Sequence, residues 1–377
     1  MGFAKRHSTS QLRYTLNLAK SQKKGWRLAG SLQPFCLSRF FVVTYWSIAM
    51  LNLAETMRGK FARQKIVIVG DLVADQFLHG TIARVSREAP VFILRHDETE
   101  TLAGGAANAA VNVASLGGNA FLIGVVGEDL NGVALLKTLD NSQVNCDFVV
   151  SDKSLNTTTK VRVLAGQDFA PRQQVIRIDY ENQQAIDSAL QNKLNENLLS
   201  ATENADAIII SDYNYGVANS QIATLANKIA VDKNIPLLVD SRFGLRNFQH
   251  ATAATPNHEE VEQILGKDFT EQDCVKLCEN LGYQSLLITR GNKGMILIEK
   301  DKPPVQFEAV GAKEAIDVTG AGDTVIATFA LSLASGLNFA ESANLANHAG
   351  GIVVMKKGTA SVSLDELLKS LKENTTQ

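Results

Sequence analysis

Residues 315–330 read AIDVTGAGDTVIATFA, a glycine-rich turn placed directly before a long apolar run of helical character. Backbone N–H groups at the start of a helix have no partner within the helix, and the helix dipole is positive there. Gly320, Ala321 and Gly322 carry no bulky side chain, so these N–H groups are open to an anion. The stretch therefore predicts an anion site, and a phosphoryl group whose charge shifts during transfer suits it.

Asp323 is expected on the first turn of that helix, beside the anion site. A carboxylate facing a bound phosphate is unfavourable unless it has chemical work, and accepting a proton from a hydroxyl that attacks phosphorus is such work. The alternative is that Asp323 caps the helix while the glycines form a tight turn. The stretch taken alone leaves both roles open.

The composition of the 377-residue chain is that of a globular protein, with 45% hydrophobic and 20% charged residues. Its length predicts one large α/β domain or two small ones. The net charge is -2, but residues 1–63 hold eleven Lys or Arg and one acidic residue, so the remainder is acidic. An acidic body gives no support to a nucleic-acid partner.

Residues 1–62 differ from the rest and are expected to lie outside the fold. Their apolar run FFVVTYWSIAML (40–51) is short for a bilayer span, and the long leader before it is unlike that of a secretory signal. An organelle transit peptide fits the composition better. A third interpretation, which we favour, is that translation begins at Met50 or Met57. We therefore expect a cytoplasmic protein with no membrane partner, and organelle targeting is the alternative.

Four cysteines in a chain of this length do not make a disulfide scaffold, so a reducing compartment is expected. Cys274 and Cys278 lie four apart on an expected helix, but no His or Cys stands nearby at metal-ligand spacing. Buried or idle thiols are therefore favoured over a metal pair.

From residue 65 onward, short apolar strands alternate with helix-length stretches. KIVIVGD (65–71) is typical of a buried first strand. Later strands of the same type are expected at 120–127, 205–213, 236–241, 285–291 and 295–300. This alternation predicts one folded domain over residues 63–377, with a doubly wound, mostly parallel sheet that binds ligands at the carboxyl ends of its strands.

Two segments, 89–105 and 157–180, instead alternate polar and apolar residues with period two. The second is expected to form a hairpin around a loop near 166–173, with Lys160 and Arg162 on one face of its first strand. Together the segments predict a small antiparallel β lid above the cleft. Solvated charges joined in salt bridges are the alternative for its basic side chains.

Two common nucleotide-binding motifs do not occur in the sequence. A P-loop needs GxxxxGK followed by Ser or Thr, and a Rossmann fingerprint needs its glycines directly after the first strand. Because the sequence contains neither motif, a dehydrogenase is not expected.

A second glycine-rich helix start lies in AGGAANAAVNVASLG (103–117), where Gly104 and Gly105 allow close backbone approach and Asn108 can bind hydroxyl groups. Asp71 and Asp75 follow the first strand, and their carboxylates suit the hydroxyls of a polyol. These residues predict a sugar site at the strand ends.

TPNHEE (255–260) places Asn257 and Glu260 three residues apart, on one face if the segment is helical. Such a pair suits Mg²⁺ held through water beside the phosphates of a nucleotide.

These motifs together resemble those of the ribokinase-like, PfkB-type carbohydrate kinases, over about residues 65–368. The most specific signatures are GGAANAAVNVASLGG and DVTGAGDT. The resemblance implies a ribokinase-like fold, ATP as co-substrate with Mg²⁺, Asp323 as catalytic base and residues 320–322 as the anion hole. It also implies a nucleotide side of the site made of Thr289, Arg290, Gly291 and Asn347.

Within that family, GDLVADQFLHGTIARVSREAPV and SDYNYG are similar to D-glycero-β-D-manno-heptose-7-phosphate kinases, the kinase half of a bifunctional ADP-heptose synthesis protein. The chain departs from that branch at DSRFGLRNF (240–248), where D-P-K-G is usual and Arg242 stands near the lost lysine. The expected reaction is transfer of the γ-phosphoryl group of ATP to a sugar or sugar phosphate, with heptose 7-phosphate (1-kinase) as the best guess. The cations expected to hold a substrate phosphate are Arg84, Arg87, Lys160 and Arg162.

Two other functions remain open on the sequence: a kinase of a neutral sugar or nucleoside, and a catalytically idle sugar-binding protein on the same fold. A nucleoside kinase would need an aromatic pocket, and only Phe77 and Phe92 stand near the start of the lid. A homodimer formed through the lid is expected.

Overall fold

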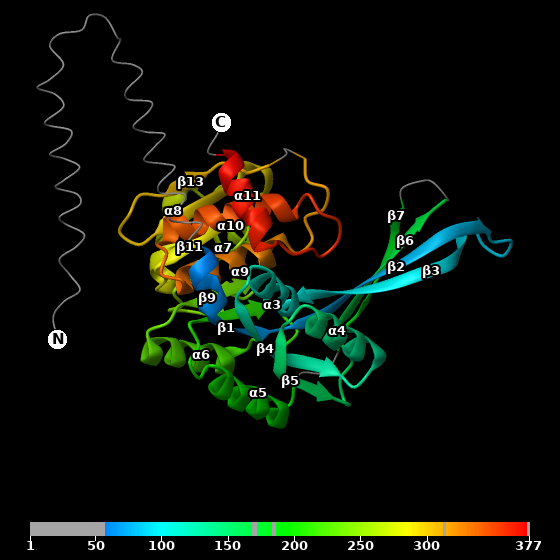
Figure 1. Cartoon of the computed structure of the whole chain (residues 1–377), viewed down its shortest axis with the longest axis horizontal. Helices are drawn as coiled ribbons and strands as arrows, with labels where there is room; N and C mark the ends of the chain where they lie inside the picture. Colours follow the sequence, from blue (N-terminus) through cyan, green and yellow to red (C-terminus); the bar gives the residue numbers. More distant parts are fainter. Residues whose placement is uncertain (1–56, 168–171, 183–185, 312–313, 375–377) are drawn as a thin grey trace, which may run out of the picture. The chain divides into compact units, whose positions relative to one another are not determined.

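The computed structural model describes residues 57–167, 172–182, 186–311 and 314–374. In this part of the chain a large α/β body carries a smaller β sheet that projects from one side of it (Figure 1). Residues 1–56 of the expected N-terminal extension lie outside the described residues.

The body is built on a sheet that has nine strands within the described residues, in the order β13-β12-β11-β10-β9-β8-β1-β4-β5. These are β1 (Lys65–Gly70), β4 (Asn119–Gly127), β5 (Asn145–Asp152), β8 (Ala207–Asp212), β9 (Leu237–Ser241), β10 (Ala253–Ala254), β11 (Ser285–Thr289), β12 (Met295–Glu299) and β13 (Val305–Phe307). Neighbouring strands from β5 to β11 are parallel, whereas β12 and β13 are antiparallel to their neighbours. The predicted mostly parallel sheet is confirmed.

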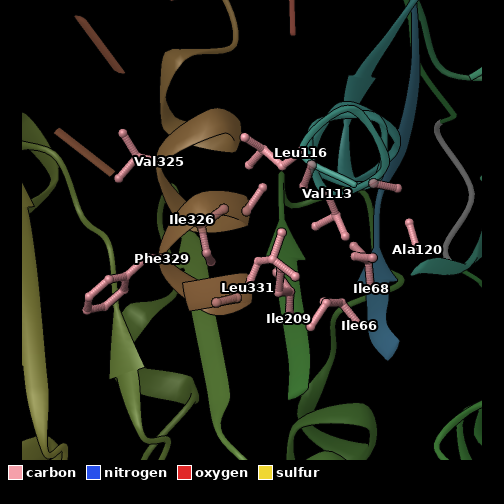
Figure 2. Close-up of a cluster of buried hydrophobic side chains, with 14 of the residues drawn as sticks. Ile66, Ile68, Val113, Leu116, Ala120, Ile209, Val325, Ile326, Phe329 and Leu331 are labelled. Atoms are coloured by element: carbon pink, nitrogen blue, oxygen red, sulfur yellow. The ribbon is translucent and has the colours of Figure 1, made fainter. Parts of the chain in front are cut away.

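The central strands are apolar on both faces because helices cover both faces. Along β1, Ile66 and Ile68 belong to one buried cluster, and Val67 and Val69 belong to the other. Figure 2 shows the first cluster, in which the two isoleucines of β1 meet residues of α3 and α9. The apolar run that the sequence shows at 65–71 thus buries β1 in the middle of the sheet, with its carboxyl end beside α3.

The helices join the strands and form the two outer layers. They are α3 (Ala106–Ser115), α4 (Leu130–Asn141), α5 (Ser188–Ala201), α6 (Ser220–Lys233), α7 (His258–Leu265), α8 (Glu271–Leu281), α9 (Ala321–Ala334), α10 (Phe339–Val353) and α11 (Leu364–Asn374), with single 3-10 turns at η1 (Phe61–Arg63), η2 (Leu245–Asn247) and η3 (Gly291–Lys293). Among the described helices, none combines the length and the apolar content that a membrane crossing requires.

The lid is a four-stranded sheet of β2 (Leu72–Val85), β3 (Phe92–Gly105), β6 (Thr159–Gly166) and β7 (Gln173–Tyr180), in the order β3-β2-β6-β7. The two segments expected from the sequence are present as β3 and as the β6–β7 hairpin, whose tip at 168–171 lies outside the described residues. The predicted antiparallel lid is confirmed in the pairs β2–β3 and β6–β7, and the structure adds β2, which pairs with β6 in parallel. The sequence hides β2 because its first four residues are all buried and show no alternation.

The folded body begins before residue 63, so the boundary expected at 62 was wrong. Residues 57–60 are helical, and Met57 and Phe61 are both 0% exposed. Their spacing of four puts both side chains on one face of a helix, and both belong to the core cluster that includes α3 and α9. The basic residues around them made this short segment look like part of the extension.

Cys274 and Cys278 are buried on α8 and are free thiols. Burial raises the pKa of each thiol to about 11. In the described part of the chain, no group of three or more His, Cys, Asp or Glu side chains is arranged to hold a metal ion. The expectation of buried thiols is confirmed.

Candidate active site

A pocket of about 790 Å³ lies where several parallel strands end and α9 begins. Its walls come from the start of α9, from Asp240 and Arg242 at the end of β9, and from Arg162 and Arg177 of the lid. The carboxyl ends of parallel strands meet at one edge of a sheet, which is why residues far apart in the chain gather here.

The start of α9 faces this pocket through Gly320, Ala321 and Gly322. Gly320 is the N-cap with φ of 77°, and no side chain in the described part of the chain caps the helix. A Cβ at Gly320 would lie 2.5 Å from Asn108 Nδ2, so only glycine lets α9 approach α3 this closely. The helix start therefore turns the N–H of Gly322 to the pocket, whereas that of Ala321 donates to the backbone oxygen of Val318 at 3.2 Å.

Asp323 lies on the first turn of α9 and is 2% exposed. Its Oδ2 accepts a hydrogen bond from Asn108 Nδ2 at 2.8 Å, and its Oδ1 accepts one from the hydroxyl of Tyr213 at 2.8 Å. Burial raises the pKa of Asp323 to about 6, although the two hydrogen bonds oppose the rise. The carboxylate does not cap α9, which weakens the purely structural role considered from the sequence.

Asp75 lies on β2 at the base of the lid and is 4% exposed. Its Oδ1 accepts a hydrogen bond from Arg162 Nη1 at 2.6 Å, and its Oδ2 accepts one from Thr359 Oγ1 at 2.8 Å. A Cβ at Gly104 would lie 2.7 Å from Asp75 Oδ2, so this glycine keeps space open beside the carboxylate. Arg162 is thus half of a largely buried ion pair rather than a free cation of the lid.

Asp71 does not have the sugar-binding position that the sequence suggests. Its Oδ2 accepts backbone hydrogen bonds from Tyr213 at 2.8 Å and Tyr215 at 3.0 Å, and its Oδ1 accepts one from Val217 at 3.0 Å. The side chain is 1% exposed. Asp71 therefore anchors the loop after β8. Gly105, with φ of 61°, lies tightly against the backbone oxygen of Asp71.

Asn257 and Glu260 form a capping box at the start of α7: each side chain accepts a hydrogen bond from the backbone N–H of the other. Both nevertheless line the main pocket, as does Asp240. Burial and the nearby charges of Glu260 and Asp323 raise the pKa of Asp240 well above its usual value. Two partly buried carboxylates beside the amide of Asn257 offer oxygen ligands that a hard divalent cation takes together with water, so these residues fit Mg²⁺.

A second pocket, of about 170 Å³, adjoins the first at Thr289, Gly291 and Gly322. Apolar side chains such as Val325 line most of it, which suits a flat aromatic base. Asn347 also lines it and donates from Nδ2 to the backbone oxygen of Glu308 at 2.7 Å. Arg290 lies on the wall of the larger pocket, so the four residues expected on the nucleotide side are brought together.

The basic residues of the lid are divided between two places. Lys160 is 8% exposed, and its Nζ lies 5.6 Å from the ring centres of both Tyr213 and Tyr215. Burial lowers the pKa of Lys160. Arg84 and Arg87 instead line a separate hollow at the far end of β2. Since Arg84 follows Asp75 by nine residues of strand, about 30 Å separate them, and the expectation that they meet one substrate within one chain was wrong.

Among the residues of the pocket that were not selected from the sequence as site residues are Tyr213, Asp240 and Arg242. Tyr213 and Arg242 each follow directly on a buried strand and Asp240 lies near the end of one, which is the signal that could have found them. The guanidinium of Arg242 lies over the ring of Tyr213, 4.5 Å from its centre. Its positive charge acts to lower the pKa of Asp323, Asp240 and Glu260, against the larger effect of burial, which raises the pKa of each.

The sequence matches the model of the pfkB family carbohydrate kinases over residues 63–367. The chain belongs to this family. It is therefore an ATP-dependent carbohydrate kinase. The matched range contains all the site residues described above.

Its relatives include two proteins named bifunctional protein HldE. The one from Pasteurella multocida (strain Pm70) is 40% identical over 316 residues, which cover 82% of this chain and 64% of the relative. The one from Koribacter versatilis (strain Ellin345) is 38% identical over 331 residues, which cover 86% of this chain and 66% of the relative. The chain thus spans about two thirds of the length of these relatives.

Solved structures with the same fold include Arabidopsis thaliana ribokinase complexed with ribose and ATP, with a TM-score of 0.62 and 22% identity over 82% of this chain and 98% of that one. Escherichia coli phosphofructokinase-2 in complex with potassium has a TM-score of 0.67 and 18% identity over 83% of this chain and 99% of that one. These likenesses confirm the ribokinase-like fold.

Proposed function

We propose that this kinase transfers the γ-phosphoryl group of ATP to a hydroxyl of a phosphorylated sugar, with D-glycero-β-D-manno-heptose 7-phosphate as its substrate and Asp323 as the general base. The observation that carries this proposal is the position of Asp323: a buried carboxylate, oriented by two donors, at the uncapped start of α9. A base with a pKa near 6 is ionised at neutral pH and still basic enough to take the proton of an attacking hydroxyl.

The N–H groups at residues 320–322 would stabilise the charge that develops on the phosphoryl group during transfer. ATP would place its base in the apolar pocket beside Val325 and Asn347, and its phosphates would extend along Thr289 and Gly291 towards α9. Mg²⁺ supplies charge neutralisation for such phosphates when it is bound. In this chain Asn257 and Glu260 would hold it through water.

The choice of a phosphorylated sugar rests on the positive charge of the pocket. Arg162 and Arg177 line it from the lid, where each also pairs with an aspartate, and Arg242 lines it from the end of β9. Arginine matches the oxygens of a phosphate with paired donors, so a substrate with its own phosphate fits this lining better than a neutral sugar. The HldE relatives favour heptose 7-phosphate among such substrates.

We also propose that two chains associate through their lids, and that the enzyme acts in the cytoplasm. The outer strand β7 exposes the apolar side chains of Val175, Ile176, Ile178 and Tyr180, and an open strand with an apolar face favours pairing with a second sheet. Light scattering of the protein and of Ile176→Lys tests the dimer, which the substitution should weaken.

The cytoplasmic location rests on the free thiols of the described residues, which suit a reducing compartment.

The test of the function is a screen for ADP release with ATP and Mg²⁺ against sugar phosphates, neutral sugars and nucleosides. Heptose 7-phosphate should give the highest kcat/KM. Asp323→Asn keeps the size of the side chain but cannot take the proton, so kcat should fall by roughly 10²–10⁴ while ATP affinity changes little. A neutral sugar as the best substrate would refute the substrate, and near-full kcat in Asp323→Asn would refute the base.

A further inference from the structure

The loop that follows β8 is tied to the beginning of β2 by one carboxylate. The three backbone hydrogen bonds that Asp71 accepts come from Tyr213, Tyr215 and Val217. Three charge-assisted bonds to one buried group fix the path of this loop firmly. The backbone position of Tyr213 is therefore set by Asp71, a residue that lies outside the reacting part of the pocket.

The side chain of Tyr213 reaches from this loop to the base. Its hydroxyl lies 2.8 Å from Asp323 Oδ1, while Asn108 holds Oδ2 from the opposite element, α3. Two donors on two different oxygens fix both the plane and the rotation of the carboxylate. Because a carboxylate oxygen can accept two hydrogen bonds, Oδ1 keeps one acceptor site free for an attacking hydroxyl.

We propose that Tyr213 is a positioning residue of the phosphoryl transfer: held in place by Asp71, it orients Asp323 and stabilises its ionised form. This inference rests on the proposed role of Asp323 as the base. Burial raises the pKa of the Tyr213 hydroxyl well above its usual value, so the phenol keeps its proton and acts only as a donor. The ionisable groups whose charge acts on Asp323 together with Tyr213 are Arg242, Asp75 and Asp240.

Tyr213→Phe isolates the hydroxyl, because the ring and its contact with Arg242 remain. The hydroxyl stabilises the charged form of Asp323, so its removal should raise the pKa of the base. The acid limb of kcat/KM, expected near pH 6 in the natural protein, should then move up by about one pH unit. At high pH, kcat should stay about tenfold lower because the carboxylate is less well oriented, whereas KM for ATP should not change.

Tyr215→Phe is the matched control, since it also removes one tyrosine hydroxyl, two residues further along the same loop. The hydroxyl of Tyr215 binds Glu181 Oε1 at 2.8 Å and not the base. The acid limb of the kcat/KM profile of Tyr215→Phe should therefore coincide with that of the natural protein. Both variants should melt within a few degrees of the natural protein, since each loses one hydrogen bond.

The inference is overturned if the pH profile of Tyr213→Phe coincides with that of the natural protein, or if Tyr215→Phe shifts the limb equally. It is also overturned if Tyr213→Phe melts far below the control, because the hydroxyl would then serve the fold. Asp323→Asn separates the two levels of the proposal. If Asp323→Asn is inactive and the pH profile of Tyr213→Phe is not shifted, only the positioning role of Tyr213 fails. If Asp323→Asn is active, the assignment of Asp323 as the base fails.

Discussion

Replacing Gly320 by alanine should cost this enzyme activity far more than stability. Gly320 has φ of 77°, a conformation that costs a residue with a Cβ about 1–2 kcal/mol. The added methyl group would also lie 2.5 Å from Asn108 Nδ2. An ordinary contact is about 1 Å longer, so the amide of Asn108 must move away from Asp323 Oδ2, which it holds at 2.8 Å.

The size of the effect follows from that displacement. A shift of about 1 Å in a group that orients the reacting atoms costs on the order of 10²-fold in rate. We therefore expect kcat of Gly320→Ala to fall by about 10²-fold. The melting temperature should fall by only roughly 2–4 °C, since the shift is the lost 1–2 kcal/mol divided by the unfolding entropy, which is large for a chain this long.

Gly117→Ala is the matched control, because Gly117 also has a positive φ, of 90°, but nothing lies within 4 Å of its added methyl group. It should lose a similar amount of stability and keep its kcat. Steady-state kinetics and thermal melts of the two variants, side by side, measure the difference. Equal kcat values in Gly320→Ala and the natural protein would refute the reasoning that Gly320 protects the geometry of the base.

Three further predictions follow from the site and the core. Arg162→Ala breaks the ion pair with buried Asp75, so KM for the sugar phosphate should rise about ten- to a hundredfold with KM for ATP unchanged; Arg84→Ala, at the far end of the lid, is the control, and equal effects would contradict the assignment. Phe61→Ala should destabilise the protein by about 3–5 kcal/mol in urea unfolding, whereas a chain that begins at Met57 should keep its melting temperature; an unchanged Phe61→Ala would mean that the segment does not belong to the core. Cys274 and Cys278 should resist alkylation at pH 7.5 until urea unfolds the protein, because burial holds their pKa at about 11, and rapid labelling by mass spectrometry would show that α8 opens.

The strands of the body could be predicted from the sequence because a strand covered on both faces must be apolar at every position. The stretch at residues 315–330 likewise predicted a helix that starts at glycines with Asp323 in its first turn, although taken alone it left the role of Asp323 open. Both features are local. They depend on residues that are neighbours in the chain, and a single stretch of sequence contains all the information they need.

The errors arose where a role depends on a distant partner. Asp71 and Asp75 look alike in GDLVAD, yet Asp71 binds three N–H groups from a loop that lies about 140 residues later, and Asp75 binds Arg162. No local pattern distinguishes the two. The same holds for Arg84, whose distance from the site follows only once β2 is known to be one continuous strand.

The continuity of β2 gives the lid the mechanics of a lever. Asp71 is the single residue between β1 and β2, and the strand then runs without a break to Val85. Any rotation about Asp71 is magnified along that arm: 5° displaces Asp75 by about 1 Å and the far end by about 4 Å. A distance probe fixed near Val85 would therefore report an adjustment of about 1 Å at Asp75 as a displacement about four times larger.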